Sequence, residues 1–164
     1  MISLRIATVG DADAIWAVLA PVIRAGETYA LDRTMPRDAA LAYWMGPDKQ
    51  TVVAVDTAGR VLGTYYCRAN QAGGGAHVAN CGYVVAGDAG GCGVAWAMAE
   101  DSFVRARARG FTAILFNFVV ASNMTAVALW QKLGFTIVGR VPMAFDHPAM
   151  GLVDALVMHR ALQA

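Results

Sequence analysis

The chain has 164 residues, of which 57% are hydrophobic and 15% are charged, and its formal net charge is +1. This length suits one folded domain, so we expect residues 1–164 to form a single domain. The near-neutral charge argues against a nucleic-acid-binding surface, and the longest apolar runs are too short to span a bilayer.

The N-terminal half shows hydrophobic periodicities typical of strands and of amphipathic helices. The predicted elements are a strand at 2–7, a helix from Asp11 to Gly26, a helix opened by Pro36 and ended by Gly46, and strands at 51–55 and 61–67. The last two strands are joined by a turn sequence, which predicts a hairpin.

The C-terminal half alternates apolar strand patterns with two helical patterns. We expect strands at about 76–85, 111–118, 135–141 and 152–160, and helices from Gly93 to Arg109 and from Asn123 to Gly134. The whole chain therefore predicts seven strands and about four helices.

Residues 123–135 have the pattern of a short capped helix. Asn123 can accept hydrogen bonds from the free N–H groups of the first turn. Ala126 and Trp130 lie at helical spacing, and Gly134 can end the helix in a left-handed conformation. Taken alone, this is the pattern of any amphipathic helix.

Residues 83–95 combine an apolar β-branched run, a glycine cluster and the start of a helix. A strand, a glycine-rich turn and a helix N-terminus together present several main-chain N–H groups to an anion. Other phosphate-binding loops fit less well. The segment lacks the Lys-Ser/Thr pair of a nucleoside-triphosphatase loop, and Trp96 stands where a dinucleotide fingerprint needs a small residue.

Together these motifs resemble the two signatures of the GNAT superfamily of acyl-CoA N-acyltransferases. Residues 123–135 resemble N-x-x-A-x-x-L-[YW]-x-K-L-G-F, and residues 90–95 resemble [QR]-x-x-G-x-[GA]. The resemblance implies an α+β (mixed α/β) fold, whose mostly antiparallel seven-stranded sheet is splayed between strands four and five. It also implies acetyl-CoA as co-substrate, with its diphosphate on the glycine-rich turn and its pantetheine arm between the splayed strands.

The resemblance assigns cofactor contacts to three segments. They are the fourth strand (Tyr83, Val84, Val85), the glycine-rich turn (Gly90, Gly91, Cys92, Gly93, Val94, Ala95) and the later helix (Asn123, Ala126, Trp130). Gly90 stands where Gln or Arg is usual, which removes a side chain and leaves the main-chain donors. Trp130 stands where many relatives have Tyr. An indole cannot protonate a leaving thiolate, so we assign no general acid and expect Trp130 to line the coenzyme cleft.

Asn80 and Asn117 fall inside the predicted fourth and fifth strands, where Asn is disfavoured. Each amide is either bonded internally or faces a ligand, because a buried unsatisfied amide costs about 1–3 kcal/mol. We expect the pair to line opposite walls of the splay and to orient the acceptor. Neither strand contains a carboxylate, which leaves Glu27 as a weak candidate for the base. A solvated surface role for Glu27 is equally well supported.

The segments H-V-A-N-x-G-Y and F-N-x-V-x-x-S-N are similar to a GNAT branch that acetylates azetidine-2-carboxylate and related proline analogues. We therefore expect a small amine or amino acid, such as a cyclic secondary amine, to attack the thioester directly. Two alternatives stay open. A protein or peptide N-acetyltransferase would need an open groove, and a non-catalytic acyl-CoA sensor would need no base.

The cysteines and the N-terminal sequence bear on the compartment. Cys67, Cys81 and Cys92 are odd in number and lack metal-ligand spacing, and no signal-peptide pattern opens the chain. We expect a cytoplasmic enzyme that uses no metal and has no nucleic-acid or membrane partner. The high apolar content leaves room for a homodimer.

Overall fold

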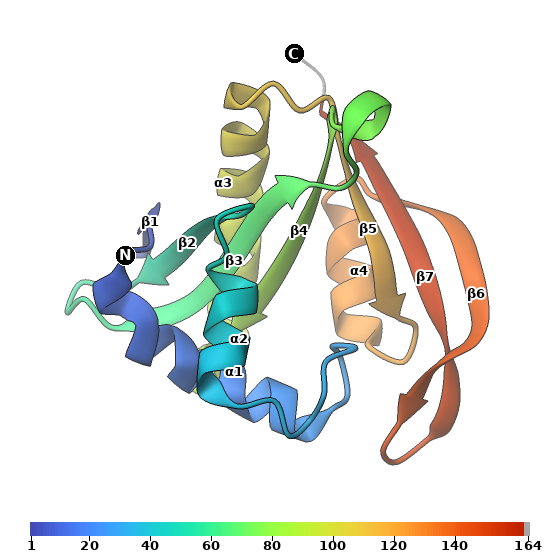
Figure 1. Ribbon diagram of the computed structural model, residues 1–164, viewed down its shortest axis with the longest axis horizontal. Coiled ribbons are helices and arrows are strands. Elements are labelled where there is room, and N and C mark those ends of the chain that lie inside the picture. The colour runs from blue at the N-terminus through green and yellow to red at the C-terminus, as the bar shows by residue number, and fades with distance from the viewer. Residues whose placement is uncertain (163–164) are drawn as a thin grey trace.

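The computed structural model describes residues 1–162, and a seven-stranded sheet forms its centre (Figure 1). The strands are β1 (Ser3–Ile6), β2 (Gln50–Val55), β3 (Val61–Ala69), β4 (Val78–Val85), β5 (Ala113–Val120), β6 (Thr136–His147) and β7 (Gly151–Ala161). Their order across the sheet is β1-β2-β3-β4-β5-β7-β6. Neighbouring strands are antiparallel except β4 and β5, which are parallel.

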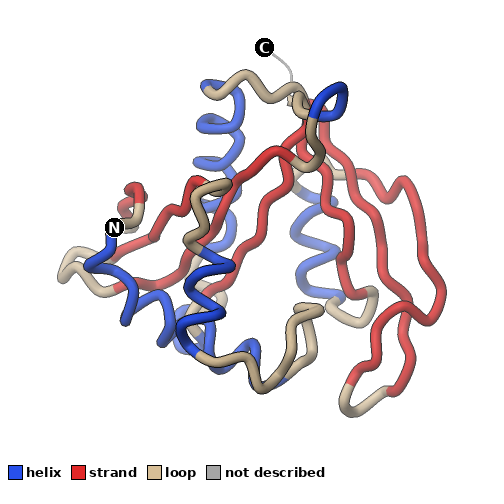
Figure 2. Tube along the Cα trace, viewed as in Figure 1, coloured by secondary structure: helices blue, strands red, loops and turns tan. Residues whose placement is uncertain are grey.

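Helices cover both faces of the sheet (Figure 2). The α-helices are α1 (Ala12–Ala25) and α2 (Arg37–Trp44) on one face and α3 (Val94–Ala108) and α4 (Met124–Lys132) on the other. Short 3-10 turns occur at Val9–Asp11, Gly73–Gly75 and Gly87–Ala89. The predicted α+β fold, with seven strands and four α-helices in residues 1–162, is confirmed.

Two apolar clusters, one on each face, hold these layers together. Ile15 of α1 and Trp44 of α2 are at most 1% exposed and pack against the sheet from one side. Met98 of α3 and Ile114 of β5 are fully buried on the other side. Burying side chains of this size stabilises the fold by about 1.5–3 kcal/mol each. Strands β2, β3 and β4 contribute residues to both clusters, so β4, the strand at the centre of the site, is packed from both faces.

The ends of α4 confirm the predicted caps. The Oδ1 atom of Asn123 accepts a hydrogen bond of 3.3 Å from the N–H of Ala126. Gly134 has a φ of +85°, and the N–H of Phe135 donates back to the carbonyl of Trp130 over 2.9 Å. This hydrogen bond spans six residues and is the closing bond of a Schellman motif. The motif needs a residue with left-handed backbone angles, a conformation that favours glycine. The helix therefore begins and ends where its sequence signals lie.

The sixth strand is longer than the strand predicted at 135–141. It continues through Pro142, and its register against β7 shifts between Val141 and Phe145. Pro142 cannot donate a ladder hydrogen bond, but β6 lies at the edge of the sheet, where proline is tolerated. Met143 follows with a φ of +50° at the irregularity. The proline therefore marks a bulge inside the strand rather than its end.

Candidate active site

The central strands β4 and β5 part shortly after they begin. Their register pairs are Val78 with Ala113 and Ala79 with Ile114, after which the strands diverge. Asn80 stands at the fork, where its Nδ2 atom donates a hydrogen bond of 3.0 Å to the carbonyl of Leu115. This amide joins the two strands at the first position that has lost its main-chain pairing. The predicted splay is present.

The alternating direction of main-chain groups decides which residues of β4 face the gap. The carbonyl of Val78 accepts a hydrogen bond from the N–H of Asn70, and the N–H of Ala86 donates one to the carbonyl of Leu62. The main-chain groups of both residues therefore turn toward β3. Because successive residues alternate, the intervening odd-numbered positions turn their N–H and C=O groups toward β5. Tyr83 and Val85 therefore point main-chain groups into the part of the gap that β5 has left.

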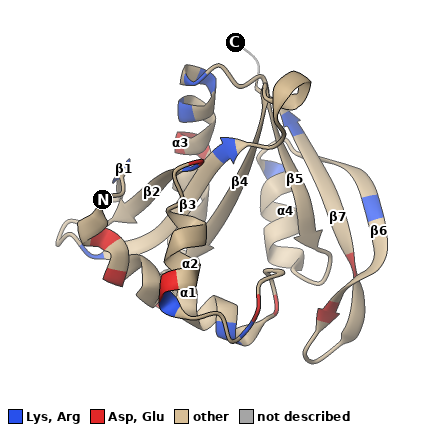
Figure 3. Ribbon diagram, in the orientation of Figure 1, with Lys and Arg blue, Asp and Glu red and all other residues tan. Residues whose placement is uncertain are grey.

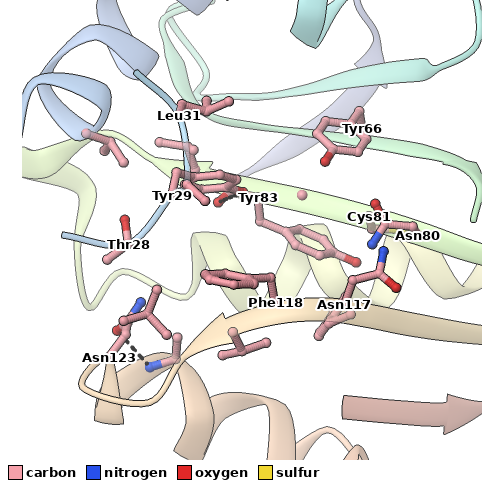
Figure 4. Close-up of a pocket in the computed structure, with 18 of the residues that line it drawn as sticks. Thr28, Tyr29, Leu31, Tyr66, Asn80, Cys81, Tyr83, Asn117, Phe118 and Asn123 are labelled. Carbon is pink, nitrogen blue, oxygen red and sulfur yellow. Dashed lines mark hydrogen bonds between the residues drawn. The ribbon is translucent and has the colours of Figure 1, made fainter. Parts of the chain in front are cut away.

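A cavity of about 360 Å³ occupies the splay (Figure 4). Its lining includes most of the predicted site residues, namely Asn80, Tyr83, Val84, Val85, Asn117, Asn123, Ala126 and Trp130. Asn80 and Asn117 are drawn at one end of the cavity and Asn123 at the other (Figure 4). Residues 90–95 and Glu27 lie outside this lining. Glu27 is exposed, so the cavity gives no geometric support to it as a base.

Aromatic rings form the floor of the cavity on the α4 side. Trp130 is 8% exposed, and its ring centroid lies 4.9 Å from that of Tyr83 and 4.8 Å from that of Phe116. The Tyr83 hydroxyl makes a 2.8 Å hydrogen bond with Ser102 of α3. Its ring is thus held on the α3 side of β4, and only its main chain is left to act at the gap.

A segment between α1 and α2 closes the cavity from the opposite face. Thr28, Tyr29, Ala30 and Leu31 all line the cavity. The hydroxyl of Tyr29 donates a 3.0 Å hydrogen bond to the carbonyl of Tyr83, which ties this segment to β4. We call residues 28–31 the cover segment. This segment lies between the two helices predicted from sequence, which end at Gly26 and begin at Pro36, and the prediction assigned no role to Tyr29.

Gly82 makes this close approach sterically feasible. A Cβ atom on Gly82 would lie 2.7 Å from the ring of Tyr66 and 3.0 Å from the Tyr29 hydroxyl. Both contacts are shorter than ordinary van der Waals distances, so any larger residue would displace the two tyrosines. The sequence signal was a glycine inside a strand, which often marks a close approach of another chain segment.

A β-bulge positions Asn117 on the other wall of the cavity. The register of β5 against β7 shifts between Phe116 and Val119, which adds one residue to β5. Asn117 is exposed there, and its Nδ2 atom donates a 2.7 Å hydrogen bond to Oδ1 of Asn70. Phe118 is 39% exposed and also lines the cavity. Strand alternation alone would not have placed these two neighbours in one cavity.

The glycine-rich turn lies at the far end of β4 and leads into α3. Gly91 and Gly93 have φ values of +74° and +78°, and a Cβ atom at either position would meet nothing within 4 Å. Gly93 caps α3 without any side-chain hydrogen bond, so the first N–H groups of the helix stay free of side-chain caps. Positive φ values beside a helix N-terminus make an anion-binding concavity. The turn fits a diphosphate.

Burial disfavours the charged forms of three tyrosines and one cysteine that line the cavity. It raises the pKa of Tyr29, Tyr66, Tyr83 and the Cys81 thiol, in each case chiefly by desolvation of the charged form. Strands β4 and β5 carry no Lys, Arg, Asp or Glu (Figure 3). Arg68 is the one charged side chain among the described residues of the lining. The cavity thus offers main-chain and amide donors but no carboxylate.

Residues 1–162 contain no group of three or more His, Cys, Asp or Glu side chains that could hold a metal ion. No helix in the described part of the chain is long and apolar enough to cross a membrane.

Known structures share this architecture over nearly the whole chain. A GCN5-related N-acetyltransferase from Kribbella flavida is 44% identical, with a TM-score of 0.93 over 98% of this chain and 97% of that chain. A phosphinothricin acetyltransferase from Sinorhizobium meliloti, solved with acetyl-CoA, is 21% identical, with a TM-score of 0.85 over 98% of this chain and 88% of that chain. The latter likeness concerns the fold alone.

Comparison of sequences gives the same assignment. The N-acetyltransferase aca1 of Schizosaccharomyces pombe is 28% identical over 133 residues, which are 71% of this chain. The match spans 63% of the length of that relative. Residues 18–135, which contain the splayed strands, the glycine-rich turn and the whole capped-helix motif, match the acetyltransferase (GNAT) family. The chain belongs to the acetyltransferase (GNAT) family.

Proposed function

We propose that this protein transfers the acetyl group of acetyl-CoA to the nitrogen of a small amine or amino acid. The observation that carries this proposal is the continuity of two sets of main-chain donors. The N–H groups of Tyr83 and Val85 face the splay, and the same strand runs into the glycine-rich turn at the N-terminus of α3. A thioester carrying a diphosphate at the other end of a long arm matches that arrangement.

The coenzyme would contact three segments of the chain. Gly91, Gly93 and the first turn of α3 would hold the diphosphate through main-chain N–H groups. The pantetheine arm would lie along β4, where the main chain of Tyr83 and Val85 is unpaired with β5, in the manner of an added strand. Asn123 and Trp130 line the same cavity from α4. We thus retain the predicted coenzyme contacts.

The cover segment favours a small acceptor. Residues 28–31 close one face of the cavity, and the Tyr29–Tyr83 hydrogen bond holds them against β4. A peptide acceptor would need an open groove, and the cover segment held by this hydrogen bond leaves less room for one. Asn80 and Asn117 present amides from the two walls and would orient the acceptor. A cyclic secondary amine such as azetidine-2-carboxylate suits a cavity of this volume and remains the first acceptor to test.

The chemistry would then consist of positioning and main-chain polarisation. A main-chain N–H on β4 would stabilise the oxyanion formed as the amine attacks the thioester carbonyl, an effect worth about 3–4 kcal/mol in other acyl transfers. Solvent would take the proton from the amine, because the tyrosines and Cys81 are held neutral. Water would protonate the departing thiolate, since Trp130 cannot. Holding both reactants together supplies most of the acceleration.

Thiol release from acetyl-CoA, measured against a panel of amines, tests this proposal. The panel begins with azetidine-2-carboxylate, cis-hydroxyproline and primary amines of similar size, and calorimetry measures coenzyme A binding in parallel. Acceleration by small amines with little response to peptides is the expected result. Coenzyme A binding without acceleration by any amine would instead identify a sensor, and absence of coenzyme binding would remove the basis of the proposal.

A further inference from the structure

We propose that Arg68 is the residue that recognises the acceptor, by binding a carboxylate on it. The inference rests on the proposed acetyltransferase function and narrows its substrate to amines that carry an anionic group. Arg68 lies on β3 and lines the cavity, where it is the single charged side chain among the described lining residues.

The register of the sheet places Arg68 beside the proposed acceptor amides. Arg68 is the cross-strand partner of Asn80 in the β3–β4 pair. Side chains directly opposite each other in an antiparallel pair project from the same face and are close neighbours. Asn80 in turn joins β4 to β5 at the fork. Arg68 therefore lies at the end of the cavity where the two asparagines lie.

This end of the cavity is distant from the proposed diphosphate site. Asn80 lies near the start of β4, whereas the glycine-rich turn follows Val85 at its end. Five residues of extended strand separate Asn80 and Val85 by about 17 Å. Arg68 is thus placed to meet the acceptor rather than the phosphates of the coenzyme.

The hydrogen-bonding capacity of Arg68 is left unused by the protein. Its Nε atom is buried without a partner in the described structure. Its nearest carboxylate is Asp48, with 3.7 Å between Nη1 and Oδ2, which exceeds hydrogen-bond length. The same carboxylate is held by Nζ of Lys49 at 3.0 and 3.1 Å. One anion therefore faces two cations, and a positive charge remains uncompensated.

A carboxylate on the acceptor would supply the hydrogen-bond acceptors and the negative charge that Arg68 lacks. The planar guanidinium matches a carboxylate in geometry and binds it through charge-assisted hydrogen bonds. The lining has no acidic side chain among the residues described, so a second amine on the acceptor would face Arg68 without compensation. The geometry thus favours amino acids and disfavours polyamines.

The test compares each amino acid with its own primary amide, which lacks the negative charge and has a lower amine pKa, so kcat/KM is compared per unprotonated amine. Azetidine-2-carboxylate and proline are the two acids, and acetylation is measured with acetyl-CoA at saturation. The wild-type protein is expected to prefer each acid about tenfold or more in kcat/KM. Arg68→Met should remove this preference by raising KM for the acids while kcat changes little, and Arg68→Lys should restore part of it.

Arg37→Met is the matched control, because Arg37 is a half-buried residue of α2 that pairs with Asp13 and Asp38 outside the cavity. It should keep the wild-type preference, and thermal melting of all variants checks folding. Equal use of acid and amide by the wild type, or an unchanged preference in Arg68→Met, overturns the inference and leaves the acetyltransferase proposal standing.

A direct binding measurement separates the two proposals if no amine is acetylated. Calorimetric titration of the same acids and amides then reports on Arg68 alone. Tighter binding of the acids that is lost in Arg68→Met supports the anion site although the proposed reaction has failed. Equal binding of acids and amides overturns the anion site as well.

Discussion

The hydroxyl of Tyr29 donates a hydrogen bond to the main-chain carbonyl of Tyr83, over 3.0 Å and across 54 positions of sequence. This bond joins the cover segment to the strand that forms the splay. It also occupies one lone pair of the Tyr83 carbonyl, and it leaves the N–H groups of Tyr83 and Val85 facing the gap. The cover segment and the strand proposed to bind the coenzyme are therefore linked through the Tyr83 carbonyl.

Removing that hydroxyl should loosen the cover segment without disturbing the sheet. Tyr29→Phe leaves a buried carbonyl without its partner, so we expect the free energy of unfolding to fall by about 1 kcal/mol. We also expect KM for the acceptor to rise about fivefold, since a freed cover segment encloses it less well. Urea denaturation and steady-state kinetics measure the two effects. Tyr43→Phe is the control, because it removes only the 3.3 Å contact with the Tyr66 hydroxyl. An unaltered KM in Tyr29→Phe would show that the segment is held by packing alone.

Two glycines with similar backbone angles separate stability from coenzyme binding. Gly93 and Gly110 have φ values of +78° and +86°, and an added Cβ meets nothing within 4 Å at either position. Gly93→Ala and Gly110→Ala should each destabilise the protein by about 1–2 kcal/mol, the cost of a left-handed residue with a side chain. Only Gly93→Ala should weaken coenzyme A binding, by about tenfold, because Gly110 follows the other end of α3. Titration calorimetry measures the affinities, and equal affinities in the two variants would exclude the turn as the diphosphate site.

Local signals explain why much of the fold was predictable from sequence. The cap at Asn123 and the left-handed residue at Gly134 depend on side-chain chemistry and backbone freedom at single positions, and both formed as expected. The splay between strands four and five was inferred from resemblance to a family, since no property of β4 or β5 alone specifies where two parallel strands part.

Features that depend on register or on distant contacts were not predicted. The extra residue of β5 beside Asn117 shows only when β5 is aligned with β7. The Tyr29–Tyr83 hydrogen bond and the pairing of Arg68 with Asn80 each join residues of different segments of the chain. Hydrophobic periodicity reports which face of an element is buried, and it carries no information about such pairings.

Loss of the Asn117 amide should affect the acceptor and leave coenzyme A binding unchanged. Asn117→Ala removes an exposed amide from the bulge, so we expect kcat/KM for the acceptor to fall about tenfold while the affinity for coenzyme A stays unchanged. Asn70→Ala is the control. It removes the partner of Asn117 but keeps the amide itself, and it should have the smaller effect. A loss of coenzyme affinity in Asn117→Ala would move this residue to the coenzyme side of the site.

The Arg5–Asp11 pair should make stability depend on pH in the acid range. Asp11 accepts from the Arg5 guanidinium at 2.7 and 2.8 Å and from the N–H of Thr8 at 2.7 Å. These bonds, the one from Arg5 first, hold the pKa of Asp11 well below its usual value. A lowered pKa in the folded state stabilises the protein above the unfolded pKa of about 4 and loses that contribution as pH falls.

Asp11→Asn should therefore lower the free energy of unfolding by about 1–3 kcal/mol at pH 7. The difference from the wild type should shrink as the pH falls below about 4. Urea denaturation at several pH values measures it, with Asp13→Asn as a control at an exposed ion pair. A difference that stayed constant with pH would mean that packing, rather than the charge, is lost in the variant.

The pH dependence of catalysis should follow the acceptor amine rather than a protein side chain. Burial raises the pKa of Cys81, Tyr29 and Tyr83, so these groups stay protonated near neutral pH and cannot take a proton from the amine. We expect kcat/KM to rise about tenfold per pH unit and to level off at the pKa of the amine. For two acceptors with different amine pKa values, kcat/KM should then level off at two different pH values.

Glu27→Gln decides between this mechanism and a carboxylate base. Glu27 is exposed and outside the cavity lining, so the variant should keep the wild-type profile within about twofold, the scale of a surface substitution. A protein base would instead give an inflection at the same pH for both acceptors, because the titrating group would belong to the enzyme. An inflection present in the wild type and absent from Glu27→Gln would identify Glu27, rather than solvent, as the proton acceptor. Glu27 and the adjoining cover segment would then have to move to reach the amine.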